Sequence, residues 1–226
     1  MKTLIIFVTL SLIFWLFFRK KVSSKKTRQL SEKRKKELER IILDRRQEVA
    51  NDKERVTKEQ IRKVLVKLNL SPFIVGLFDE TENLREYGFF DTFAPAYHII
   101  NSTKKEQIVF EIDRYIPLFE TMDDFLEVLA YDNVLEGYIR YCPEDNIPRN
   151  TYDVLTWDGV FVRQILTWYE DCKTDDEILT VCHLLGLNYG RQILENIPVE
   201  LGTEYTDEQI SNWENQTIDK IGGRIK

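Results

Sequence analysis

The chain has 226 residues, of which 43% are hydrophobic and 12% aromatic, enough to build a hydrophobic core. Its 9 glycines and 6 prolines exclude collagen-like and low-complexity chains. The net charge of −6 conceals two regions: residues 19–63 carry 18 Lys/Arg and 8 Asp/Glu, a net of +10, whereas residues 64–226 carry 13 and 30, a net of −17. Because nucleic-acid binding needs a cationic face, we expect no nucleic-acid partner for the acidic region.

An apolar run extends from Leu4 to Phe18 and is interrupted only by Thr9 and Ser11. As a helix it would span about 22 Å, against a hydrocarbon thickness of about 30 Å. Basic side chains directly after the run would reach the interface and narrow that gap. We therefore predict a transmembrane anchor over residues 1–18. The length also suits a cleaved signal peptide, but no small-residue cleavage site follows.

A cluster of basic residues follows the apolar run and is typical of a stop-transfer signal. We expect these side chains to contact anionic headgroups, so that the lipid bilayer is the partner of residues 1–28. They are Arg19, Lys20, Lys21, Lys25, Lys26 and Arg28. Because only Lys2 and the amino group precede the run, the positive-inside rule places the N-terminus outside or in a lumen and the C-terminal domain in the cytosol.

Residues 19–56 form a basic juxtamembrane stalk in this interpretation, with a flexible collar over residues 19–29 and a helix from Leu30 to about Val56. Apolar residues are sparse in the helical part. A heptad pattern is interrupted by Arg45 and Asp52, so the composition favours a single solvated helix over a coiled coil.

Residues 57–226 are predicted to form an acidic globular α+β domain that is predominantly helical. Three capping boxes mark helix starts. They pair Thr57 with Gln60, Thr174 with Glu177, and Thr206 with Gln209. Ser71-Pro72 is expected to end the first of these helices, and glycines 186 and 222 the other two.

The middle of the domain contains the β-rich segments 96–100 and 108–112, which predict a hairpin. A helix is then expected from Thr121 to Leu129. Within residues 154–169, one helical face is strongly apolar and predicts a buried central helix, starting as late as Asp158-Gly159. That face carries Trp157, Phe161, Ile165 and Trp168.

One segment resembles a known family. Over Ile108–Leu129 a strand-like stretch leads into PLFETMDDFLEVL, an acidic segment with Phe and Leu, and this order resembles the end of SMI1/KNR4-type (SUKH) domains. The resemblance implies a binding domain. The chain lacks the upstream Leu-Pro and Gly-Gly features of that family, and about 95 residues follow where such a fold would end.

No motif for catalysis is present. His98 and His183 stand far apart, and Cys142, Cys172 and Cys182 lack the paired spacing of a zinc site or a disulfide framework. Carboxylates are abundant, but most fall at expected helix N-termini, where the helix dipole favours them. They include Asp123, Asp124, Glu127, Glu144, Asp145, Glu170, Asp171, Asp175, Asp176 and Glu177. We expect no cofactor and no metal site.

These features favour a single-pass membrane-anchored, non-enzymatic protein-interaction module that faces the cytosol and binds a protein through its acidic domain. Three alternatives remain open. They are a structural component of a larger assembly such as a virion or organelle complex, an SMI1/KNR4-like binding domain, and a hydrolase or transferase whose site no motif reveals.

The predicted orientation is testable because the chain contains the glycosylation sequons Asn69-Leu70-Ser71, Asn101-Ser102-Thr103 and Asn215-Gln216-Thr217. When the full chain is expressed in a eukaryotic secretory system, a cytosolic domain should gain no glycan. Gel mobility before and after glycosidase treatment measures this. A glycosidase-sensitive increase in mass would place the domain in the lumen instead.

Overall fold

The computed structural model describes residues 25–89, 93–122, 126–143, 147–197 and 206–225. These residues form helices and one sheet, which confirms an α+β fold with more helix than strand. The chain divides into two compact units, Met1–Lys53 and Glu54–Lys226, whereas the sequence placed the boundary at residue 57. The predicted anchor, residues 1–18, lies outside the described residues. Among those described, no helix is both long and apolar enough to span a bilayer.

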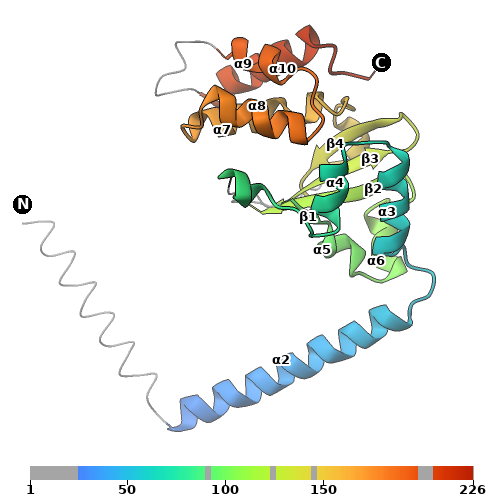
Figure 1. The fold of residues 1–226 in the computed structure, drawn as a ribbon. Helices are drawn as coiled ribbons and strands as arrows, with labels where there is room; N and C mark the ends of the chain where they lie inside the picture. The colour runs from blue at the N-terminus through green and yellow to red at the C-terminus, as the bar shows by residue number, and fades with distance from the viewer. Residues whose placement is uncertain (1–24, 90–92, 123–125, 144–146, 198–205, 226) are drawn as a thin grey trace, which may run out of the picture. The chain divides into compact units, whose positions relative to one another are not determined.

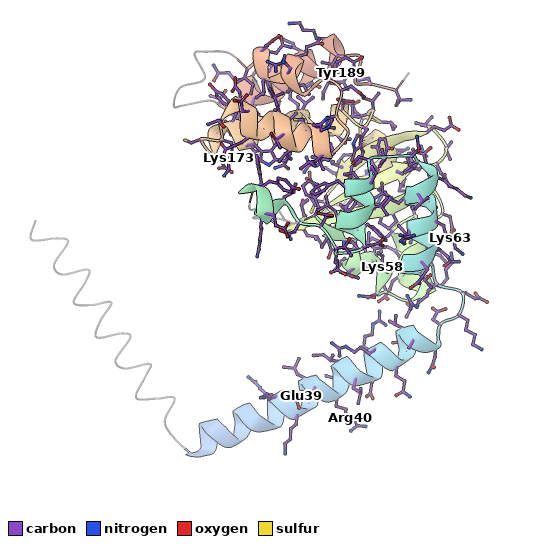
Figure 2. All side chains as sticks on the ribbon, in the orientation of Figure 1. Glu39, Arg40, Lys58, Lys63, Lys173 and Tyr189 are labelled. Carbon is purple, nitrogen blue, oxygen red and sulfur yellow. The ribbon has the colours of Figure 1, made fainter. Side chains whose placement is uncertain are left out.

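The described part of the first unit is one long helix, α2 (Lys25–Asn51). It begins inside the segment that was expected to be a flexible collar, so the collar prediction is wrong from Lys25 onward. Its apolar residues Leu38 and Ile42 are exposed. An ion pair joins Arg45 to Glu48, three residues later, at 2.8 Å. Figure 2 shows charged side chains such as those of Glu39 and Arg40 projecting from this helix.

The second unit opens with short helices and one brief strand. Their bounds are α3 (Lys58–Lys67), α4 (Pro72–Phe78), η1 (Leu84–Tyr87), β1 (Ala94–Pro95), α5 (Tyr97–Ile100) and α6 (Lys104–Val109). The capping box of Thr57 and Gln60 is present as predicted. Ser71 caps α4, whose first residue is Pro72, so this dipeptide starts a helix as well as following one.

The sheet is antiparallel with strand order β1-β2-β3-β4. Its longer strands are β2 (Tyr115–Met122), β3 (Leu126–Asp132) and β4 (Gly137–Tyr141). Pro117, which donates no hydrogen bond, sits at an irregularity in β2. Asp132 closes the β3–β4 turn by accepting hydrogen bonds from the backbone of Val134 and Leu135 and from Arg114. Burial opposes its charge, but these bonds prevail and lower the pKa of Asp132.

Two secondary-structure predictions in this region are wrong. The expected hairpin over residues 96–100 and 108–112 is absent: α5 covers most of the first segment, and the second holds the end of α6, which a capping box of Thr103 and Glu106 starts, followed by a turn. Within the expected helix Thr121–Leu129, the described residues are strands instead: Thr121 and Met122 belong to β2 and Leu126–Leu129 to β3, which pair antiparallel. Adjacent residues such as Val128 and Leu129 are both buried, so both faces of the sheet are covered. Strands of that kind lose the alternation that distinguishes them from helices.

The C-terminal part is helical, and Figure 1 shows its helices gathered as one group. After η2 (Arg149–Thr151) come η3 (Gly159–Phe161), α7 (Val162–Glu170), α8 (Asp175–Leu184), α9 (Gly190–Glu195) and α10 (Asp207–Lys220). The capping boxes predicted for α8 and α10 are present. The central helical segment begins at Gly159, the later of the expected starts.

The predicted core face is confirmed. Trp157, Phe161, Ile165 and Trp168 are at most 8% exposed. Trp157 also donates a hydrogen bond from Nε1 to the carbonyl oxygen of Leu185 at 2.9 Å. This stripe joins the sheet to the C-terminal helices, since the Trp157 ring lies against Tyr138 of β4.

Truncating this stripe should destabilise the domain. We expect Trp168→Ala to lower the free energy of unfolding by about 3–5 kcal/mol, because it removes a buried aromatic ring and leaves a cavity. Tyr169→Ala is the matched control, since the neighbouring Tyr169 is 38% exposed. Chemical denaturation measures both. Equal stability losses in the two variants would contradict the assignment of Trp168 to the core.

Candidate functional site

A cleft of about 880 Å³ opens between the sheet and the C-terminal helices. Its walls come from β3, β4, the segment 152–167 and α10. The lining is partly apolar and includes Leu126, Val160 and Ile218. The charged side chains along it are Glu127, Arg140, Asp153, Arg163 and Glu214. The volume lies in the range of known ligand pockets, about 300–1,000 Å³, toward its upper end.

One wall of the cleft forms where residues 154–156 pair with β4 on one side and with the C-terminal segment on the other. On the first side, Leu155 exchanges backbone hydrogen bonds with Tyr138 of β4 at 2.8 Å in each direction. On its other side, the backbone of Thr156 donates to Gly223 at 2.8 Å. A Cβ atom added to Gly159 would lie 2.5 Å from the Gly223 carbonyl oxygen, so the two backbones meet too closely for a side chain. This contact fixes the end of α10 beside the sheet.

Most charges of the cleft are neutralised by partners within the domain. Arg140 pairs with Glu127 diagonally across β3 and β4, at 2.5 Å, and also donates to the Val160 carbonyl oxygen at 3.3 Å. Asp153 forms an ion pair with Arg224. Three of the five charged side chains of the cleft are therefore held in place by the fold.

Glu214 and Arg163 are different, because among the described residues neither side chain has a hydrogen-bond or ion-pair partner. Both are partly buried. Burial raises the pKa of Glu214. The positive charges of Arg163, Arg140 and Arg224 act to lower this pKa, and the negative charge of Glu127 acts to raise it. A partly buried carboxylate with a raised pKa in a cleft is a candidate for a functional group.

The groups around Glu214 suit the recognition of charge more than the activation of a nucleophile. Both histidines are exposed and neither lines the cleft. Cys142 lines it, but no histidine stands beside it to serve as a base. Among the described residues, no group of three His, Cys, Asp or Glu side chains is arranged to hold a metal ion.

A second pocket of about 480 Å³ lies beside Trp157 and Asp158. Asp158 is 5% exposed and accepts hydrogen bonds from the backbone of Asn188 and Tyr189 at 2.7 and 2.8 Å. Its carboxylate thus accepts hydrogen bonds from backbone N–H groups at the start of α9, which is a structural role. We assign no binding role to this pocket.

The residues considered from the sequence are scattered in the structure. Glu127 lies in the cleft, whereas Asp175, Asp176 and Glu177 occupy the first turn of α8. His98 is in helix α5 rather than a strand, with its ring 5.8 Å from that of Phe110. The cysteines are free, and burial raises the pKa of Cys182 to about 12.

Several of the charged residues considered from the sequence lie outside the described residues. They are Asp123, Asp124, Glu144, Asp145, Arg19, Lys20 and Lys21. The other basic residues of the predicted membrane-surface cluster, Lys25, Lys26 and Arg28, lie in α2.

The sequence contained one overlooked signal for this site. Glu214 stands four residues after Ile210 and four before Ile218, on the apolar stripe of α10. A carboxylate on the face of a helix that packs on a core is unusual and marks a candidate site. Arg140 and Arg163 carry no comparable signal, because only the tertiary fold brings them together.

No protein-family model matches the chain, and neither a curated protein nor a solved structure is significantly similar to it. The candidate site therefore depends on its own geometry and electrostatics.

The raised pKa of Glu214 makes a prediction about stability. The folded state favours the protonated Glu214 carboxyl more than the unfolded state does. The stability that this carboxyl contributes at low pH is therefore lost as the pH rises through its raised pKa. Glu214→Gln removes this loss, and its melting temperature relative to the unsubstituted chain should be higher at about pH 7 than at about pH 4. Thermal unfolding at the two pH values measures the difference. Glu208→Gln, an exposed site on the same helix, should show no such change; a similar change would contradict the assignment.

Proposed function

We propose that this chain is a single-pass membrane-anchored, non-enzymatic protein-interaction module whose acidic domain faces the cytosol and docks a partner in the cleft. The observation that supports it most is the pair of unpartnered charges, Glu214 and Arg163, in a cleft whose other charges are already neutralised. An unpaired charge on a partly buried wall costs stability. A partner that supplies the missing charges would recover that cost.

The form of the cleft also supports docking. Its lining combines apolar and charged side chains, the usual composition of recognition sites, where apolar contacts provide affinity and charges provide orientation. The alternative hydrolase or transferase would need a nucleophile with an adjacent base. The described residues of the cleft offer the Glu127–Arg140 pair instead, which is fixed by its own ion pair.

The tether is proposed from the sequence. The apolar run of residues 1–18 would hold the chain in a bilayer and the basic residues 19–28 would lie at its surface. The charged helix α2 would then serve as a spacer, since its described side chains are largely exposed. Tethering raises the effective concentration of the domain toward partners on the same membrane.

Site-specific photo-crosslinking tests the docking role. A photoreactive amino acid replaces Ser211, an exposed residue at the edge of the cleft, in the full chain within native membranes. We expect discrete protein adducts after irradiation. The same replacement at Lys63, exposed on α3, is the control and should give none. Adducts with small molecules alone, or equal protein adducts from both positions, would reject the docking module and, in the first case, favour an enzyme.

A further inference from the structure

The two unpartnered charges lie on different elements that face the same cleft. Glu214 belongs to α10 and Arg163 to α7, and their opposite charges interact electrostatically without a direct hydrogen bond among the described residues. The other cationic groups near Glu214 are engaged elsewhere, Arg140 with Glu127 and Arg224 with Asp153. An occupant of the cleft thus meets the Glu214 carboxylate, which can pair with a cation, and the Arg163 guanidinium, which can donate hydrogen bonds to an oxygen.

The charge of the whole domain decides the sign of the occupant. Residues 54–226 carry 32 Asp/Glu against 17 Lys/Arg. Such an excess attracts cationic partners over distances of about a Debye length, 8 Å at physiological ionic strength, and repels anionic ones. A cation that arrives at the cleft finds Glu214, whose carboxylate is partly withdrawn from water. An ion pair formed there is screened less than one on the open surface.

We propose that the cleft binds a basic peptide segment of a partner protein, with a Lys or Arg side chain paired to Glu214 and a backbone carbonyl oxygen accepting from Arg163. This deepens, and rests on, the proposed docking function. Every peptide offers carbonyl oxygens, so Arg163 adds affinity without a demand for sequence. Glu214 supplies the selection for a basic residue.

The dimensions favour a peptide over a small cation. At about 880 Å³ the cleft exceeds what a single ammonium group fills. Leu126 and Leu155 are the partly exposed aliphatic residues of its lining. The apolar stem of a Lys or Arg side chain would lie along such a surface while its charged end reaches the carboxylate. A small polyamine would leave these apolar side chains largely uncovered.

The test uses the full chain in a non-ionic detergent and a fluorescein-labelled peptide of alternating lysine and serine, with fluorescence anisotropy as the readout. We expect saturable binding at physiological ionic strength. Glu214→Gln should weaken it about tenfold or more, the loss typical of a charge-assisted hydrogen bond. Glu208→Gln makes the same change of charge on the same helix outside the cleft, and should bind as the unsubstituted chain does.

A second pair of variants tests the location without changing charge. Ser211→Trp places a bulky ring at the edge of the cleft from an exposed position and should block binding. Asn212→Trp, on the next exposed residue outside the cleft, should not. Equal losses for Glu214→Gln and Glu208→Gln would show non-specific attraction and overturn the proposal. It is likewise overturned if the peptide fails to bind, or if spermine binds at Glu214 and the peptide does not.

These outcomes separate the two levels of the proposal. If Ser211 crosslinks to a protein in membranes while the lysine peptide does not bind, the docking function stands and only the basic nature of its ligand is wrong. If the crosslink is absent as well, the docking function itself fails.

Discussion

The fold depends on the double pairing of residues 154–156, which bond to β4 on one side and to the returning C-terminal segment on the other. Leu155 bridges Tyr138 and Arg224, so the last residues of the chain extend the sheet. The backbones of Gly159 and Gly223 lie too close together for a side chain to fit between them, so the end of α10 is held in position beside η3. The cleft exists because this closure positions a helix from the end of the chain against strands from its middle. A change at Gly223 would therefore alter the site without touching its charged residues.

The same closure explains why Glu214 is held without a partner. Ile210 and Ile218, one turn on either side, pack on the core and fix the face that α10 presents. The carboxylate is thus carried into the cleft by the apolar residues around it. Its cost is modest because the group stays partly accessible and Arg163 and Arg140 reduce the unfavourable field. Stability that is given up at one position in this way is typical of functional sites, where a ligand later supplies the missing interaction.

The features that could be predicted from the sequence are those that depend on local chemistry. Thr174 with Glu177 and Thr206 with Gln209 mark their helices correctly, because a capping box is satisfied within one turn. The hairpin of β2 and β3 was mistaken for a helix, because helices and neighbouring segments cover both faces of the sheet and its strands lose their alternation. In the cleft, Glu127 was among the carboxylates noted from the sequence, and Glu214 is marked by its place on the apolar stripe of α10. The Glu127–Arg140 pair depends on strand register, and Arg163 on the packing of α7, neither of which local patterns encode.

Under the proposed function, the opposite net charges of residues 19–63 and 64–226 favour different partners for the two regions. Residues 19–63 would be attracted to anionic surfaces such as lipid headgroups, and residues 64–226 to cationic proteins. A straight helix of 27 residues separates its own two ends by about 40 Å, roughly five Debye lengths at physiological ionic strength. At that separation the basic end of α2 contributes little to the field at its other end. The basic residues at the start of α2 therefore act on partners near that end of the helix rather than on those near Asn51.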